Sequence, residues 1–339
     1  MIKEIIDQIK TNKFIAVIVG LVLAMLILVF WPVNKTNLPV KEIAMLKNSK
    51  DYKMDVLDNK ITSINWQNME PKIPENTNII DNQSSKIGES DLQKLAGWIG
   101  INNMTKIIDE KGLMMLKDKD KGSSIHINYG NNFVQFNRGY MGEDYFKMLI
   151  TDQDIDLAKK SFEILSNQLL EWTSGNKAIA TEIEYQAIIE PRTVTSTKSN
   201  ANIVVIKANI EFDNKAIKTS FGAPLIVAKY GTGGLLVELK IENPKLNLAK
   251  GKEIKLLTWS QIKTISSKEI GVFSIQGNRE FELSTQQDII NNLTVKSIKI
   301  EYYFAPINKT FMPMLVGEGT SELSGGPVNV TFGIPLAVN

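Results

Sequence analysis

An uninterrupted apolar run close to the N-terminus limits the fold of this chain more than any other feature. Residues Phe14 to Trp31 carry no charged or strongly polar side chain, and Pro32 and Val33 extend the run to twenty residues. A helix of about 20 apolar residues crosses the hydrocarbon core of a bilayer, which is about 30 Å thick. A secretory signal peptide has a shorter apolar segment that ends at small residues, whereas this run ends in a tryptophan suited to the membrane interface. We therefore expect an uncleaved transmembrane anchor at residues 14–33 rather than a buried core helix.

Lysines lie on both sides of this run, so their bias does not fix its orientation. Three lysines lie in residues 1–13 and five in residues 34–53. Because long polar domains are translocated largely regardless of their charge, we expect a cytoplasmic tail at 1–13. The Lys- and Asn-rich residues 34–55 are typical of a membrane-proximal spacer. The expected localisation is the cell membrane, with a single pass and an extracytoplasmic C-terminal domain.

Beyond the spacer, the hydrophobic pattern predicts an α+β fold. Residues 56–148 are expected to form a small α+β domain, with an extended loop from Trp66 to Ser90 followed by a short helix. The clearest helix runs from Asp152 to Thr173, with Thr151 as its N-cap and apolar residues three and four positions apart. Runs rich in β-branched and aromatic residues then predict strands at 179–189, 203–212, 225–229, 235–242, 296–304 and 328–332.

Three short segments recur in the same order and indicate an internal duplication. They are Thr151–Ile155 and Thr285–Ile289, Ile-Glu-Tyr at 183–185 and 300–302, and Phe-Gly-x-Pro-Leu at 221–225 and 332–336. We expect two tandem units of a helix followed by antiparallel strands, at 149–250 and 285–339, joined by a connection at 251–284. If so, Tyr185 should superpose on Tyr302, and Pro224 on Pro335.

This layout resembles a bacterial family. The N-terminal apolar helix, the repeated helix-plus-sheet units and the stretch Thr310–Gly319 (TFMPMLVGEG) resemble the extracytoplasmic YycH/YycI and PepSY-like proteins. The resemblance covers residues 85–339 in layout. It implies a membrane-anchored domain that works by binding a protein partner in or near the membrane and that, in some members, regulates a sensor kinase. It implies no catalytic residues.

The amino-acid composition argues against several classes of catalytic and binding site. The chain has no cysteine and one histidine, His126, which excludes disulfides, thiolate sites, a cysteine nucleophile and histidine clusters that bind metal. Its formal charge is +2, and only three of the 39 basic residues are arginines (Arg138, Arg192 and Arg279), which argues against nucleic-acid binding. We expect no metal and no cofactor.

Several motifs that could carry chemistry have simpler structural explanations. Ser260–Lys263 fits the S-x-x-K pattern of serine acyl-transfer enzymes, but Lys218–Ser220 and Ser174–Asn176, which approach its companion motifs, precede it in the chain instead of following it. Gly231–Gly234 lies between two predicted strands and indicates a hairpin turn rather than a phosphate-binding loop. His126 alternates with Ile125 and Ile127, which indicates a solvent-facing strand position.

Paired carboxylates leave one enzymatic alternative open. Glu182/Glu184, Glu238/Glu242 and Glu280/Glu282 could serve a cell-wall-associated glycosidase, although solvated sheet faces show the same pattern. A purely structural envelope spacer is a third interpretation. We expect a binding or interaction protein rather than an enzyme, with no catalytic, cofactor-binding or metal-binding residues.

Overall fold

The computed structural model describes residues 40–44, 53–57, 60–67, 69–110, 112–118, 122–129, 132–139, 145–189, 192–220, 222–265, 269–277, 289–305, 309–323 and 326–337. The chain divides into two compact units, Met1–Val40 and Lys41–Asn339. The features below belong to the second unit.

The structure corrects the predicted membrane localisation. Among the residues it describes, no helix is both long enough and apolar enough to cross a bilayer. The longest of them, α4 (Asp152–Leu169), has acidic residues in its first turn and buries only one face. The anchor predicted at residues 14–33 and the tail at 1–13 lie outside the described residues. A single-pass anchor with an extracytoplasmic domain is therefore not supported.

The predicted α+β class is also wrong, because strands make up most of the described chain. They are numbered β1 to β21, and nineteen of them belong to one mixed sheet. The α-helices in the same residues are α3 (Glu89–Trp98), α4 and the short α5 (Trp259–Lys263). The error arises at Asn-, Gly- and Pro-containing segments, which have low strand propensity alone but are held in the sheet by pairing with other strands.

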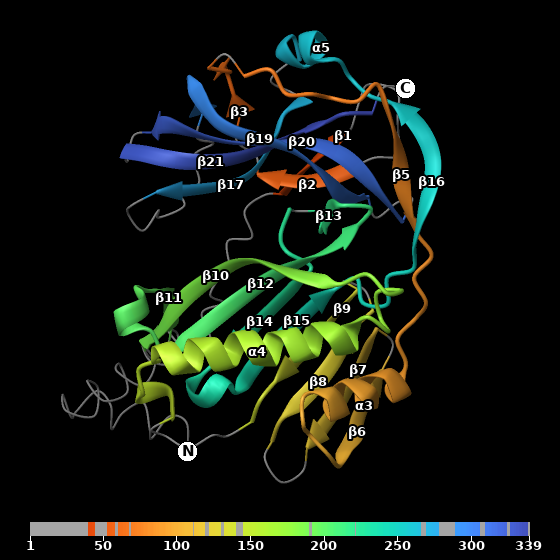
Figure 1. Ribbon diagram of the computed structural model, residues 1–339, viewed down its shortest axis with the longest axis vertical. Coiled ribbons are helices and arrows are strands. Elements are labelled where there is room, and N and C mark those ends of the chain that lie inside the picture. Colours follow the sequence, from red (N-terminus) through yellow and green to blue (C-terminus); the bar gives the residue numbers. More distant parts are fainter. Residues whose placement is uncertain are drawn as a thin grey trace, which may run out of the picture. The chain divides into compact units, whose positions relative to one another are not determined.

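One group of strands forms an antiparallel platform beneath α3 and α4 (Figure 1). Its hydrogen-bonded order is β6-β7-β8-β9-β15-β14-β12-β10-β11. The bounds are β6 (Met104–Glu110), β7 (Leu113–Asp118), β8 (Ser124–Asn128), β9 (Phe133–Asn137), β10 (Ala178–Ile189), β11 (Arg192–Thr195), β12 (Ile203–Phe212), β14 (Ile226–Tyr230) and β15 (Leu236–Glu242). Ala158 and Phe162 of α4 share one core with Ile206, Ala228 and Leu239 of the sheet.

The remaining strands pair around a second core. β16 (Leu248–Lys255) pairs with β5 (Asn76–Asn82), which pairs with the start of β20 (Thr310–Leu323), and β20 lies between β19 (Leu293–Ala305) and β21 (Gly326–Pro335). β17 (Gly271–Gly277) pairs with β21 and with β2 (Lys53–Leu57), which pairs with β1 (Val40–Ala44). β4 (Ile64–Asn65) pairs with β19, and β3 (Lys60–Ile61) pairs with β18 (Ile289–Ile290).

The platform and its helices lie within an insertion between two strands that pair with each other. β5 ends at Asn82 and β16 begins at Leu248, and these two residues are partners in the antiparallel ladder. Residues 83–247 therefore leave the β5–β16 ladder after Asn82 and return to it at Leu248. The short strand β13 (Lys215–Lys218) provides a further link, since it pairs with β12 and runs parallel to β19.

The tandem units at 149–250 and 285–339 stay a prediction, but the residues expected to superpose have different surroundings. Pro224 precedes β14 and lies outside any strand, whereas Pro335 is the last residue of β21 and faces Met314. Tyr185 is half-buried on β10, whereas Tyr302 is fully buried on β19. The helix start predicted at Thr285–Asp288 lies outside the described residues, and the chain that follows is strand.

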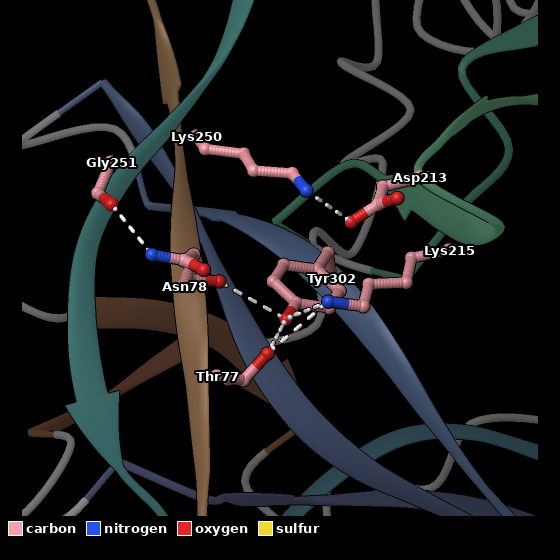
Figure 2. A network of polar contacts seen from close by, with 7 residues as sticks. All are labelled: Thr77, Asn78, Asp213, Lys215, Lys250, Gly251 and Tyr302. Atoms are coloured by element: carbon pink, nitrogen blue, oxygen red, sulfur yellow. Dashed lines mark hydrogen bonds and ion pairs between the residues drawn. The ribbon is translucent and has the colours of Figure 1, made fainter.

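A polar network fixes β13 to β5 and β19 (Figure 2). The Tyr302 hydroxyl lies 2.7 Å from Thr77 Oγ1, donates to the Asn78 carbonyl oxygen at 3.1 Å and accepts from Lys215 Nζ at 3.1 Å. Beside it, Lys250 pairs with Asp213 at 3.1 Å. Each of these side chains has a partner on another part of the chain, and these bonds hold β13, β5 and β19 together.

The next residues along β13 and β19 form a buried ionic cluster. Glu301 is 4% exposed, and its carboxylate binds Lys218 at 2.9 Å and Lys299 at 3.1 Å. The Tyr303 hydroxyl donates to the same carboxylate at 3.3 Å. Burial and the neighbouring negative charge raise the pKa of Tyr303 far above its ordinary value, so the phenol stays protonated.

Candidate ligand-binding site between α3 and α4

A cavity of about 250 Å³ lies where α3 and α4 meet the ends of the platform strands. Its walls come from the last turn of α3, the middle of α4, the residue after β9, the end of β14 and the start of β15. The lining residues are Trp98, Ile99, Arg138, Ser161, Ile164, Leu165, Gln168, Tyr230, Gly234, Leu235 and Leu236.

The sequence of α4 places four lining residues on one helix face. Ser161, Ile164, Leu165 and Gln168 are three, four and seven positions apart, which is the spacing of a single face. The helix is fixed at its start by a capping box in which Thr151 and Asp154 bind each other's backbone N–H. The helix start at Asp152 and the N-cap Thr151 confirm the sequence prediction.

The glycine-rich turn between β14 and β15 closes one end of the cavity. Asp154 Oδ1 accepts a hydrogen bond from the Gly233 N–H at 2.7 Å, and Ser161 Oγ donates to the Gly234 carbonyl oxygen at 3.2 Å. A Cβ on Gly234 would lie 2.6 Å from Leu157 Cβ, so the turn approaches α4 as closely as only glycine permits. The predicted hairpin turn is confirmed, and its backbone groups bind α4.

Asp154 keeps its charge in this position. Burial alone would raise the pKa of Asp154, but hydrogen bonds from Thr151 and from the Gly233 N–H hold it below its ordinary value. The carboxylate therefore clamps the turn to the helix at neutral pH.

Arg138 supplies the positive charge of the cavity. Its Nε donates to the Leu236 carbonyl oxygen at 2.6 Å, and its guanidinium carbon lies 5.5 Å from the centre of the Phe136 ring. Within the part of the chain that the structure describes, no carboxylate pairs with Arg138. Burial lowers the pKa of Arg138, while the nearby Tyr145 acts in the opposite direction, and a guanidinium remains charged at neutral pH in any case.

Two buried polar atoms beside the cavity have no hydrogen-bond partner among the described residues. They are the hydroxyl oxygen of Tyr230, whose side chain is 1% exposed, and Oε1 of Gln168. An unsatisfied buried polar group costs about 1 to 3 kcal/mol, and native structures contain few of them. Burial raises the pKa of Tyr230, so its phenol stays protonated and can donate.

The rim of the cavity is apolar and open to solvent. Ile164 is 59% exposed and Leu235 is 37% exposed, and both line the cavity. Trp98 packs against Trp172, with 5.3 Å between ring centres. The cavity thus combines an apolar entrance with a few polar groups inside, which is the usual composition of a small-molecule site.

The carboxylates predicted as pairs lie elsewhere and are matched with lysines. Glu182 and Glu184 both bind Lys207, as expected on a solvated sheet face. In the same way, Lys229 binds Glu238 at 2.8 Å, and Lys240 binds Glu242 at 2.6 Å. Glu280 and Glu282 lie outside the described residues.

The other predicted motifs are spread over separate elements. Ser260 and Lys263 are exposed on α5, and Lys218 is bound to Glu301. Ser174 has a positive φ beyond the end of α4 and donates to the Leu246 carbonyl oxygen at 3.0 Å.

His126 lies half-buried on β8, on the sheet face opposite α4, because the alternating Ile125 and Ile127 belong to the core. Burial lowers the pKa of His126. No group of three His, Asp or Glu side chains in the described ranges could hold a metal ion.

Sequence reasoning missed the cavity because its residues come from distant parts of the chain. Only Arg138 carried a signal, since it is one of three arginines in the sequence. Nothing in the local sequence marks Gln168 or Tyr230.

Comparison of the sequence with models of known protein families gives no match, and a search among curated proteins gives none either. The resemblance to YycH/YycI and PepSY-like proteins, together with the protein partner and sensor-kinase regulation that it implies, stays a prediction.

Proposed function

We propose that this chain is a binding protein that holds a small ligand in the cavity between α3 and α4 without transforming it. The observation that carries the proposal is the Tyr230 hydroxyl, which is buried beside the cavity and has no partner among the described residues. A bound ligand would supply that partner and remove the penalty of an unsatisfied polar group.

The lining residues favour binding over catalysis. A hydrolytic site needs a nucleophile next to a base, or two converging carboxylates. Among the described residues of the lining, the hydroxyl groups are those of Ser161, which donates to the Gly234 carbonyl oxygen, and Tyr230, whose phenol is protonated. The described lining contains no histidine and no carboxylate.

The proposal can be tested with a small neutral probe and the full-length protein. We expect 3-phenylpropionamide to show saturation transfer from the protein by NMR, with a dissociation constant in the millimolar range or below. Ile164→Trp, at the rim, should fill the entrance and weaken this binding at least tenfold. Ile107→Trp is the matched control, because Ile107 is 51% exposed on β6 and does not line the cavity.

Tyr230→Phe separates a binding role from a structural one. Removing an unpartnered buried hydroxyl should leave the free energy of unfolding of the unliganded protein unchanged or higher, while binding of the probe weakens. Equal binding of the probe to the Ile164→Trp and Ile107→Trp variants would show that the cavity is not the binding site.

A further inference from the structure

The charge of Arg138 restricts the chemistry of the ligand. The lysines of the neighbouring strands, Lys207, Lys229 and Lys240, each bind a glutamate on the other face of the sheet. Arg138 lines the cavity, and none of the described carboxylates binds it. A half-buried cation that no described carboxylate neutralises is unfavourable, so the cavity favours a ligand that brings a negative charge.

The geometry around Arg138 favours a carboxylate in particular. The bond from Nε to the Leu236 carbonyl oxygen and the contact with the Phe136 ring hold the guanidinium in place. Its two terminal nitrogens remain to donate, and such a pair matches the two oxygens of a carboxylate. A lysine at this position would bind as a point charge without this directionality.

The rest of the lining suits an apolar body with little further polarity. Trp98, Ile164 and Leu235 offer apolar surface, and Tyr230 and Gln168 offer one hydroxyl and one amide. One guanidinium balances one negative charge, which favours a monoanion over a phosphate dianion. The volume of about 250 Å³ exceeds the roughly 150 Å³ of a cavity that binds benzene, so it admits a ring or short chain together with a carboxylate.

We infer that the ligand is a small monocarboxylate with an aromatic or aliphatic body, held through its carboxylate by Arg138 and through its body by the apolar rim. This inference rests on the proposed binding function of the cavity. Tyr230 would donate a hydrogen bond to the same carboxylate or to a polar atom beside it.

A matched pair of probes tests the inference on the full-length protein. 3-Phenylpropionate and 3-phenylpropionamide have the same body and differ in charge at one end. We expect the carboxylate to bind at least tenfold more tightly, measured as dissociation constants by NMR titration. Arg138→Gln should remove this preference, so that the two probes bind that variant within about twofold of each other, while Arg138→Lys should restore only part of it.

The outcomes separate this inference from the proposal on which it rests. If the amide binds and the carboxylate binds no more tightly, the cavity is a ligand site and the carboxylate assignment is wrong. If neither probe binds the unsubstituted protein, the proposed function itself fails. An intact preference in Arg138→Gln would show that another group selects the charge. Amide binding by that variant reports whether its cavity is still folded.

Discussion

Alanine substitutions of Gly233 and Gly234 test how closely the glycine-rich turn packs against α4. Both have left-handed backbone conformations, with φ of 65° and 70°. A Cβ on Gly234 would lie 2.6 Å from Leu157 Cβ and 2.9 Å from Ala158 N, whereas a Cβ on Gly233 would meet no described atom within 4 Å. The two alanine substitutions therefore differ only in the space available for one methyl group.

The expected magnitudes follow from these contacts. An alanine in the left-handed conformation destabilises the folded state by about 1 to 2 kcal/mol. The lower entropy of the unfolded chain offsets about 0.4 to 1 kcal/mol of this. Gly233→Ala should therefore lower the free energy of unfolding by about 1 kcal/mol. Gly234→Ala adds a clash with atoms of α4 that cannot move away, worth about 1 to 3 kcal/mol, for a total of about 2 to 4 kcal/mol.

Urea denaturation followed by circular dichroism measures both variants. The urea concentrations at the midpoints of unfolding should differ between the two variants. The dependence of the free energy of unfolding on urea concentration should be equal, since neither substitution alters the surface exposed on unfolding. Equal losses for the two variants, within about 0.5 kcal/mol, would refute the close approach of the turn to α4. That result would also remove one wall of the proposed cavity.

Four further substitutions test other parts of the structure. The folded-state pKa of Asp154 is lowered, so the carboxylate stabilises the fold fully above about pH 4, and this contribution is lost as pH falls through that pKa. In the Asp154→Asn variant, the free energy of unfolding measured by urea titration should therefore fall less steeply as the pH is lowered through this range. Glu301→Gln leaves Lys218, whose side chain is 16% exposed, without a carboxylate partner and should lower the free energy of unfolding by about 3 kcal/mol. Glu182→Gln affects a more exposed ion pair and should change the free energy of unfolding by less than about 1 kcal/mol. Similar losses for Glu301→Gln and Glu182→Gln would contradict the buried ionic cluster around Glu301. Tyr302→Phe should lower the melting temperature through a loss of about 1 to 3 kcal/mol, and an unchanged melting temperature would show that the network in Figure 2 adds nothing.

Local sequence signals predicted the elements that depend on their own residues. The N-cap at Thr151 and the period of three and four predicted the start of α4, and the runs rich in β-branched residues at 203–212 and 235–242 coincide closely with β12 and β15. These signals lie within the elements themselves: α4 buries one face, and most residues of β12 are buried.

Elements that depend on distant partners were not predictable in the same way. β5 was expected to be part of an extended loop because its residues, NTNIIDN, include three asparagines and an aspartate, yet it pairs with β16 and β20. Its strand conformation is imposed by hydrogen bonds to residues far along the chain, where propensity is a weak guide. The cavity was missed for the same reason, since Trp98, Arg138 and Tyr230 come together only after the platform has formed.

The insertion also determines the order in which the chain can acquire structure during synthesis. β5 leaves the ribosome early, but Asn82 meets Asn247 only 165 residues later. At about 5 to 20 residues per second, β5 waits roughly 8 to 30 s with its backbone unpaired, while the complete helix-covered platform can already fold. An exposed strand rich in valine and isoleucine would be prone to aggregate during this interval. The asparagines and the aspartate of β5, which lower its strand propensity, are therefore well suited to keep this strand soluble on the nascent chain until it pairs.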